Sequence, residues 1–83
     1  MILHIGCDEF VPLSSIVAVL DVQSHPELMN EILSQERDGA SIQRIGQEEA
    51  KSAILTVSGE HRVFFLSPIS VQTLRKRVES GSA

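Results

Sequence analysis

Six short apolar stretches, each bounded by glycine, proline or polar residues, predict β-strands along the chain. They span residues 2–5, 9–11, 16–20, 40–45, 51–57 and 62–66. The first two flank a turn and predict a tight hairpin, and the last two predict a second hairpin. The third stretch is continuously apolar and mostly β-branched, which indicates a strand buried on both faces.

A helix start signal follows the third strand. Ser24 is placed to cap a helix, Glu27 lies three residues later as a capping box requires, and Pro26 is tolerated in the first turn. The apolar residues that follow recur on one helical face: Leu28, Met29, Ile32 and Leu33. Gly39 is a typical residue just after a helix end. The pattern predicts an amphipathic helix over residues 25–38.

A second helix is predicted near the end of the chain. Ser70 follows Pro68 and can accept a hydrogen bond from the first helical turn. The apolar positions after it lie along one narrow helical edge: Val71, Leu74 and Val78. The pattern predicts a helix over residues 71–79, and residues 80–83 are expected to fray.

These elements predict one α+β domain over residues 1–83, with a small, mostly antiparallel sheet, a mid-chain amphipathic helix and a C-terminal helix. A chain of this length buries only about 60–65% of the surface of its unfolded form, so its core is thin. The core is predicted to be aliphatic, because the only aromatic residues are Phe10, Phe64 and Phe65. A thin core and many strand edges favour self-association, and we expect a homo-oligomer.

The sequence points to the cytoplasm. Cys7 is the single cysteine, so no intrachain disulfide can form, which fits a reducing compartment. Residues 1–6 lack the basic region of a signal peptide. The apolar run at residues 16–20 is far too short to span a bilayer, so no membrane association is expected.

No catalytic or metal-binding set is expected. His4, His25 and His61 are scattered, and none has a partner at metal-ligand spacing. Cys7 has the chemistry of a nucleophile, but a free cysteine more often behaves as a small buried apolar residue. The sequence therefore predicts a protein that is not an enzyme and needs no metal or other cofactor.

Charge is distributed unevenly along the chain. The formal net charge is −4, but residues 1–41 carry seven acids and one base, whereas residues 42–83 carry six bases and four acids. An asymmetry of this kind can orient a protein toward a polyanion or let unlike faces of neighbouring subunits meet.

A basic cluster stands out in the second half. Arg75, Lys76 and Arg77 occupy the predicted C-terminal helix, and they are expected to fan across the face opposite its apolar edge. Lys51 and Arg62 of the second hairpin are expected to extend this cluster. Such a patch binds phosphates through counterion release. Cations near a helix C-terminus also oppose the helix dipole, so charge alone leaves DNA contact and a solvated helix end both open.

Several segments, in this order along the chain, resemble the bacterial extracellular matrix regulators RemA and RemB. The RemB branch is the more similar of the two, and the resemblance covers nearly the whole chain. The segments that carry it are residues 3–6 (LHIG), 16–21 (IVAVLD), 51–55 (KSAIL), 63–70 (VFFLSPIS) and 73–77 (TLRKR).

The resemblance implies a cytoplasmic DNA-binding protein that activates genes for the biofilm matrix and assembles into ring-like homo-oligomers. In the RemA branch an arginine precedes the third strand, and an arginine cluster precedes the second hairpin. The matching positions here are Ser15 and residues 47–49, Gln-Glu-Glu, which lack positive charge. Lys51 and Arg77 remain basic.

Two functions follow from these observations. The first is a DNA-binding transcription regulator that contacts phosphates through Arg75, Lys76 and Arg77, with Lys51 or Arg62 in support. The second is an oligomeric interaction module that acts through protein partners, such as a RemA-type subunit, with little DNA binding of its own. The acidic N-terminal half and the neutral or acidic matching positions motivate the second.

Overall fold

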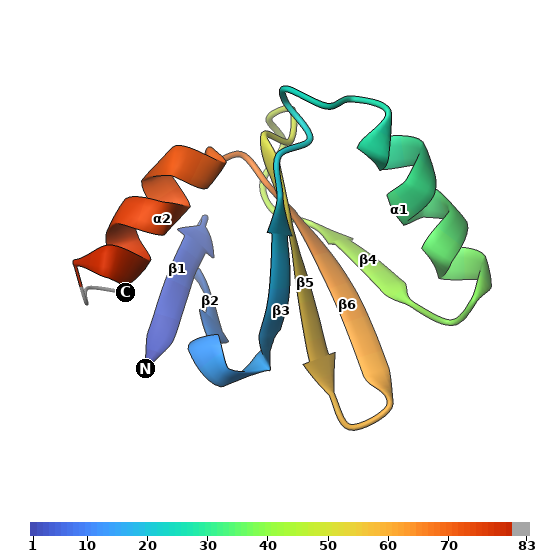
Figure 1. The fold of residues 1–83 in the computed structure, drawn as a ribbon, viewed down its shortest axis with the longest axis horizontal. Coiled ribbons are helices and arrows are strands. Elements are labelled where there is room, and N and C mark those ends of the chain that lie inside the picture. The colour runs from blue at the N-terminus through green and yellow to red at the C-terminus, as the bar shows by residue number, and fades with distance from the viewer. Residues whose placement is uncertain (81–83) are drawn as a thin grey trace.

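The computed structural model describes residues 1–80, and it forms two sheets and two helices (Figure 1). Residues 81–83 of the tail that was expected to fray lie outside the described residues. The elements in chain order are β1 (Ile2–Gly6), β2 (Glu9–Pro12), a short 3₁₀ turn (Leu13–Ser15), β3 (Ile16–Leu20), α1 (Leu28–Arg37), β4 (Ser41–Arg44), β5 (Ser52–Ser58), β6 (His61–Ser67) and α2 (Val71–Glu79).

The predicted α+β class is confirmed, and the strands divide into two sheets. β1 and β2 form a separate antiparallel hairpin, and the other strands form a sheet in the order β3-β5-β6-β4. β4 runs parallel to β6, whereas β3, β5 and β6 pair antiparallel. The crossover through α1 therefore joins the two outer strands of this sheet, and the β5–β6 hairpin fills the space between them.

The first hairpin forms as predicted, around a two-residue turn. Gly6 pairs with Glu9, and the residues between them, Cys7 and Asp8, both have positive φ angles, 47° and 63°. Positive φ at both central residues is the geometry that matches the twist of a hairpin. Cys7 is exposed at this tip, so the expectation of a buried cysteine is wrong.

β3 is an edge strand, and the expectation of burial on both faces is wrong. It pairs only with β5, and the Val17 side chain is 62% exposed. A short apolar run has the same pattern in a central strand and in an edge strand that faces other elements. The run therefore predicted the strand correctly but not its position in the sheet.

α1 begins at Leu28, three residues later than expected, because Ser24 does not cap it. The Ser24 backbone N–H instead donates to Asp21 Oδ1 at 2.9 Å, and Glu27 occupies the N-cap position without a side-chain hydrogen bond. An aspartate that binds a nearby backbone N–H holds the chain in a turn rather than a helix. Residues 21–27 are accordingly a series of turns.

α1 ends at Arg37, and Gly39 terminates it as predicted, two residues later, with a φ angle of 98°. The N–H of Gly39 donates to the carbonyl of Glu36, and the N–H of Ala40 donates to that of Gln35, at 3.2 and 3.1 Å. This pair of bonds is the Schellman motif, and it requires a residue that tolerates a positive φ.

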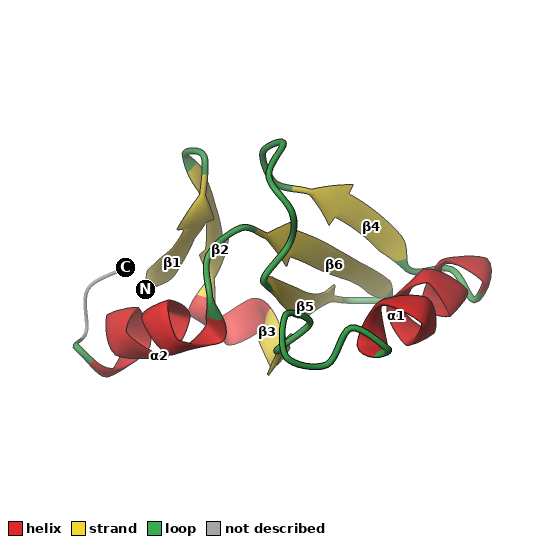
Figure 2. Ribbon diagram, turned by 90° about the horizontal axis from the view of Figure 1, so that it is seen from above, coloured by secondary structure: helices red, strands yellow, loops and turns green. Residues whose placement is uncertain are grey.

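Each face of the four-stranded sheet supports its own apolar cluster. The neighbours Phe64 and Phe65 point to opposite faces and pack in different clusters. The cluster beneath the hairpin and α2 contains Leu3, Ile5, Val11, Ile45, Ile54 and Leu74. The cluster beneath α1 contains Val22, Ile32, Ala40, Ala53, Phe64 and Leu66. Figure 2 shows α2 beside the hairpin and α1 beside β4 and β6.

Candidate interaction surface

The start of α2 is fixed by buried serine hydroxyls. Ser67 Oγ donates to the carbonyl of Ile5 at 2.7 Å and accepts from the N–H of Ile69 at 3.0 Å. Ser52 Oγ donates to the carbonyl of Ile69 at 2.7 Å. These bonds join β5, β6 and β1 at the point where the chain enters α2. Because both serines are fully buried, the bonds also set the direction in which the helix leaves the sheet.

The predicted N-cap of α2 is confirmed. Ser70 Oγ accepts from the N–H of Thr73 at 3.3 Å, and the helix runs from Val71 to Glu79. Leu74 is 1% exposed and anchors the helix in the first cluster. The apolar edge predicted from the sequence therefore faces the β1–β2 hairpin and β3.

The three consecutive basic residues of α2 point in three directions. Arg77 is half-buried, and its guanidinium donates to the carbonyl of His4 at 2.9 Å and lies 3.4 Å from His4 Nδ1. The His4 ring in turn packs on Phe10, with the ring centroids 4.9 Å apart. Arg77 thus ties α2 to β1, which sequence reasoning missed because the two lie at opposite ends of the chain.

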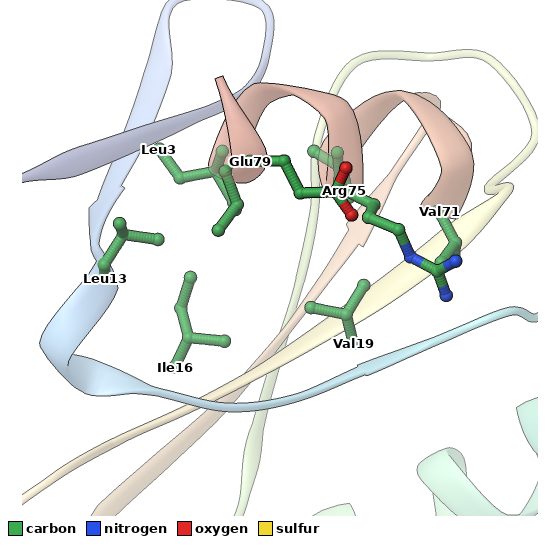
Figure 3. Close-up of a pocket in the computed structure, with 9 residues that line it drawn as sticks. Leu3, Leu13, Ile16, Val19, Val71, Arg75 and Glu79 are labelled. Carbon is green, nitrogen blue, oxygen red and sulfur yellow. The ribbon is translucent and has the colours of Figure 1, made fainter. Parts of the chain in front are cut away.

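Arg75 and Lys76 are exposed, and no hydrogen bond or ion pair engages their side chains within residues 1–80. Arg75 stands on the wall of a groove, beside Val71 and Val19 (Figure 3). The expectation that all three cations lie opposite the apolar edge is therefore wrong. Arg75 and Arg77 flank that edge, and Lys76 alone occupies the opposite side, as a spacing of about 100° per residue requires.

The other two predicted contact residues lie at opposite ends of the β5–β6 hairpin, and only Lys51 is at the end from which α2 departs. Lys51 precedes β5, at the end of the sheet from which α2 departs, and it is exposed. Arg62 pairs with Val57 near the other end. Its guanidinium donates to Gln35 Oε1 at 2.9 Å and to the carbonyl of Asp38 at 2.8 Å, which fixes the C-terminal end of α1.

The resemblance matches Ser15 and residues 47–49 to arginines of the RemA branch, and the structure shows where these positions lie. Ser15 Oγ donates to the carbonyl of Pro12 at 2.8 Å within the 3₁₀ turn. Residues 47–49 are exposed in the loop before β5. This loop packs on the tip of the first hairpin, since a Cβ on Gly46 would lie 2.9 Å from Cys7 Sγ. Two exposed carboxylates, Glu48 and Glu49, therefore lie on a loop beside the hairpin.

An apolar groove of about 590 Å³ opens between α2 and β3 (Figure 3). A volume of this size is within the range of ligand-binding clefts. β1 and the 3₁₀ turn contribute to its floor, and the residues that line it are Leu3, Leu13, Ile16, Val19, Val71, Leu74, Arg75, Val78 and Glu79. Of the two walls of this groove, the sequence predicted only the one formed by α2, through the spacing of the apolar residues along that helix.

Within residues 1–80 the structure brings together no group of three or more histidine, cysteine or acidic residues that could hold a metal ion. Neither of the helices in that range is long and apolar enough to cross a membrane. The described surface therefore offers exposed cations and an apolar groove as its two main features for interaction.

The chain belongs to the RemA-like family. The family model described as extracellular matrix regulatory protein A-like matches residues 2–78, nearly the whole chain. This confirms the family resemblance, although the match does not separate the RemB branch from RemA. No curated protein matches the chain in a direct comparison of sequences. The family is one of regulatory proteins of the extracellular matrix.

Proposed function

From this membership we propose that the protein is a non-enzymatic transcription regulator of the RemB branch, which acts in the cytoplasm and binds DNA as a homo-oligomer. The family supports a role in regulating extracellular matrix or biofilm genes. DNA is the polyanion through which a small regulator with an exposed basic helix would act.

One observation carries the proposal: Arg75 and Lys76 are exposed on α2 and have no partner within residues 1–80. Lys51 is a third exposed cation, at the end of the sheet where α2 begins. Free side chains of this kind neutralise phosphates and release counterions from DNA, which makes the affinity strongly dependent on salt. We therefore assign direct phosphate contact to Lys76, Arg75 and Lys51.

Arg77 and Arg62 have a supporting role in this proposal. Their guanidinium groups already donate to backbone carbonyls of His4 and Asp38. Releasing them toward DNA would break hydrogen bonds that hold the helices in place. Arg77 instead positions α2, and Arg62 acts at the far end of the sheet.

Self-association would strengthen a weak contact. One subunit with two or three phosphate contacts binds DNA weakly, but an assembly that repeats the same helix along the duplex gains affinity through its high effective concentration. We therefore propose that the binding unit is the oligomer, in agreement with the thin core expected of a chain with 83 residues.

The test is a DNA-binding titration over a salt series with matched variants. We expect Arg75→Ala combined with Lys76→Ala to weaken binding at least tenfold and to flatten the slope of log affinity against log salt concentration by about one unit per lost contact. Arg37→Ala removes an exposed cation from α1 and serves as the charge control. Equal affinity and slope in the wild type and the double variant would refute α2 as the DNA contact.

The acidic loop supports a second candidate function. Glu48 and Glu49 are exposed, and the resemblance matches them to arginines of the RemA branch. A carboxylate surface repels DNA and suits a basic protein partner. In this alternative the protein acts through a RemA-type subunit. Size-exclusion chromatography of the two mixed proteins should then show one complex, and the double variant Glu48→Lys with Glu49→Lys should disrupt it. Separate elution of the wild-type proteins would refute it.

A further inference from the structure

His4 is a titratable side chain to which the proposed function gives no role, yet it lies where α2 is attached. Arg77 Nη1 lies 2.9 Å from the His4 carbonyl oxygen and 3.4 Å from His4 Nδ1. Both side chains are half-buried. The buried anchor of α2, Leu74, comes one turn before Arg77. The Arg77 contact is therefore what ties the C-terminal half of α2 to β1.

The geometry of this contact requires one arrangement of protons on the His4 ring. A guanidinium only donates hydrogen bonds and always stays charged. The ring nitrogen that faces it must accept, so His4 Nδ1 is unprotonated and the proton of the neutral ring lies on Nε2. A charged histidine carries a proton on both nitrogens. Protonation of His4 therefore turns two N–H groups toward each other and opposes two positive charges.

The other charged side chains of α2 point away from His4. Arg75 and Glu79 line the groove on the far side of the helix, and Lys76 lies opposite the apolar edge. α2 thus presents only the Arg77 cation to the His4 ring.

The first hairpin supplies no carboxylate to offset this cation. β2 presents the uncharged ring of Phe10, whose centroid lies 4.9 Å from that of His4. Glu9 precedes Phe10, and neighbouring residues of a strand point to opposite faces. Asp8 belongs to the turn at the tip of the hairpin. Within residues 1–80 no carboxylate pairs with His4, since the one close histidine–carboxylate pair lies elsewhere.

We propose that His4 is a pH-sensitive positioning residue, whose neutral ring holds α2 on β1 and whose protonated ring weakens that attachment. Histidine is the side chain that ordinarily changes charge between about pH 5 and 8. The contact is complete while the ring is neutral, and it is lost as the pH falls through the range in which the ring gains its proton. Two like charges about 4 Å apart in water shift an equilibrium about fivefold.

The contact between His4 and Phe10 does not change this expectation. A charged ring is attracted to an aromatic face. His4 and Phe10, however, are cross-strand partners within one hairpin. Their contact persists when α2 detaches, so its energy cancels in the equilibrium between attached and detached α2. The pH dependence therefore acts through Arg77 alone.

Hydrogen exchange of the α2 amides at about pH 7.5 and about pH 5.5 tests the proposal, after correction for the intrinsic pH dependence of exchange. We expect the opening constant of α2 in the wild type to rise about fivefold at the lower pH, while that of α1 stays constant. His4→Gln keeps a polar side chain that cannot become charged, and it should abolish the rise. His61→Gln is the matched control and should keep it, because His61 is exposed at the start of β6, away from α2.

Arg77→Gln provides a second test if His4→Gln does not fold. It should open α2 more readily at both pH values, without a further rise at the lower one. An opening constant of α2 that is equal at both pH values in the wild type would overturn the proposal. So would an undiminished rise in His4→Gln or Arg77→Gln. The experiment contains no DNA, so its outcome is independent of the DNA binding proposed above.

Discussion

α1 and α2 cover different faces of one sheet, and each is anchored by a single fully buried side chain, but the two helices are secured differently. Ile32 anchors α1, and Leu74 anchors α2. α1 lacks a side-chain N-cap and is secured at its C-terminal end by the Gly39 turn and by Arg62 from β6. α2 is secured at its N-terminal end by Ser70 and the serines before it.

The comparison shows how basic residues are divided between structure and surface. Each helix is attached by one arginine. Arg62 of β6 donates to the Asp38 carbonyl at the end of α1, and Arg77 of α2 donates to the His4 carbonyl of β1. Such charge-assisted hydrogen bonds are stronger than those between neutral groups. Because Arg62 and Arg77 are engaged in this way, the basic surface available to a phosphate is smaller than the sequence suggests. Arg75 and Lys76 lack such partners within residues 1–80 and belong to this surface.

The largest effect on stability should come from truncating either of the buried side chains that anchor the helices, Leu74 or Ile32. We expect Leu74→Ala and Ile32→Ala each to lower the free energy of unfolding by about 2–5 kcal/mol, because each leaves a cavity under a helix. Chemical denaturation measures this loss. Leu33→Ala, at a position 48% exposed, should cost much less. A loss confined to one of the two core variants would show that the helices do not contribute equally.

The serine junction should matter only to the α2 side. Ser67→Ala removes a hydroxyl that satisfies both the Ile5 carbonyl and the Ile69 N–H. We expect a loss of about 2–3 kcal/mol, because buried polar groups are left without partners. Hydrogen exchange should accelerate in β1 and α2 before α1. Ser34→Ala, whose hydroxyl is exposed on α1, is the control. Uniform acceleration would mean that the two sides unfold as one unit.

The two structural arginines offer a direct comparison of the attachments. Arg62→Gln and Arg77→Gln each remove charge-assisted bonds to a carbonyl, and we expect each to cost about 1–2 kcal/mol. Exchange should rise at the C-terminal end of α1 in the first variant and in α2 in the second. If Arg77→Gln abolished DNA binding while its stability and helix exchange matched the wild type, Arg77 would be a contact residue rather than a support.

The smallest effect concerns the turn before α1. The hydrogen bond from the Ser24 backbone N–H, with help from the Ser24 hydroxyl and the Gln23 N–H, lowers the pKa of Asp21 below its ordinary value of 3.8. Because the pKa is lower in the folded state, this stabilisation is complete above pH 3.8 and disappears as the pH falls through the folded-state pKa.

Asp21→Asn should therefore lose less stability than the wild type when the pH is lowered below 3.8, as measured by denaturation at each pH. The α2 side has no matching carboxylate turn within the described residues, so α2 exchange should respond less to this substitution than α1 exchange. An NMR titration that gave Asp21 a pKa at or above 3.8 would contradict the role of the Ser24 hydrogen bond.

Local signals in the sequence were sufficient to predict most of the helices and strands. Ser70 and the spacing of Val71, Leu74 and Val78 predicted α2, and Gly39 predicted the end of α1, because caps and glycine turns depend on neighbouring residues. The predicted start of α1 was wrong because the Asp21 carboxylate accepts from the Ser24 backbone N–H and holds this segment in a turn, so Ser24 does not cap the helix. That competition is local, but the propensity of either residue does not show which one prevails.

The sequence by itself determined the elements, the α+β class and the presence of three cations on the final helix. Tertiary structure alone decided which cations remain exposed, because Arg77 meets His4 from 73 positions away and Arg62 meets Asp38 from 24 positions away. It also placed β3 at an edge and so opened the groove beside α2. Contacts between residues distant in the chain depend on how the elements pack, and hydrophobic periodicity reports only on each element separately.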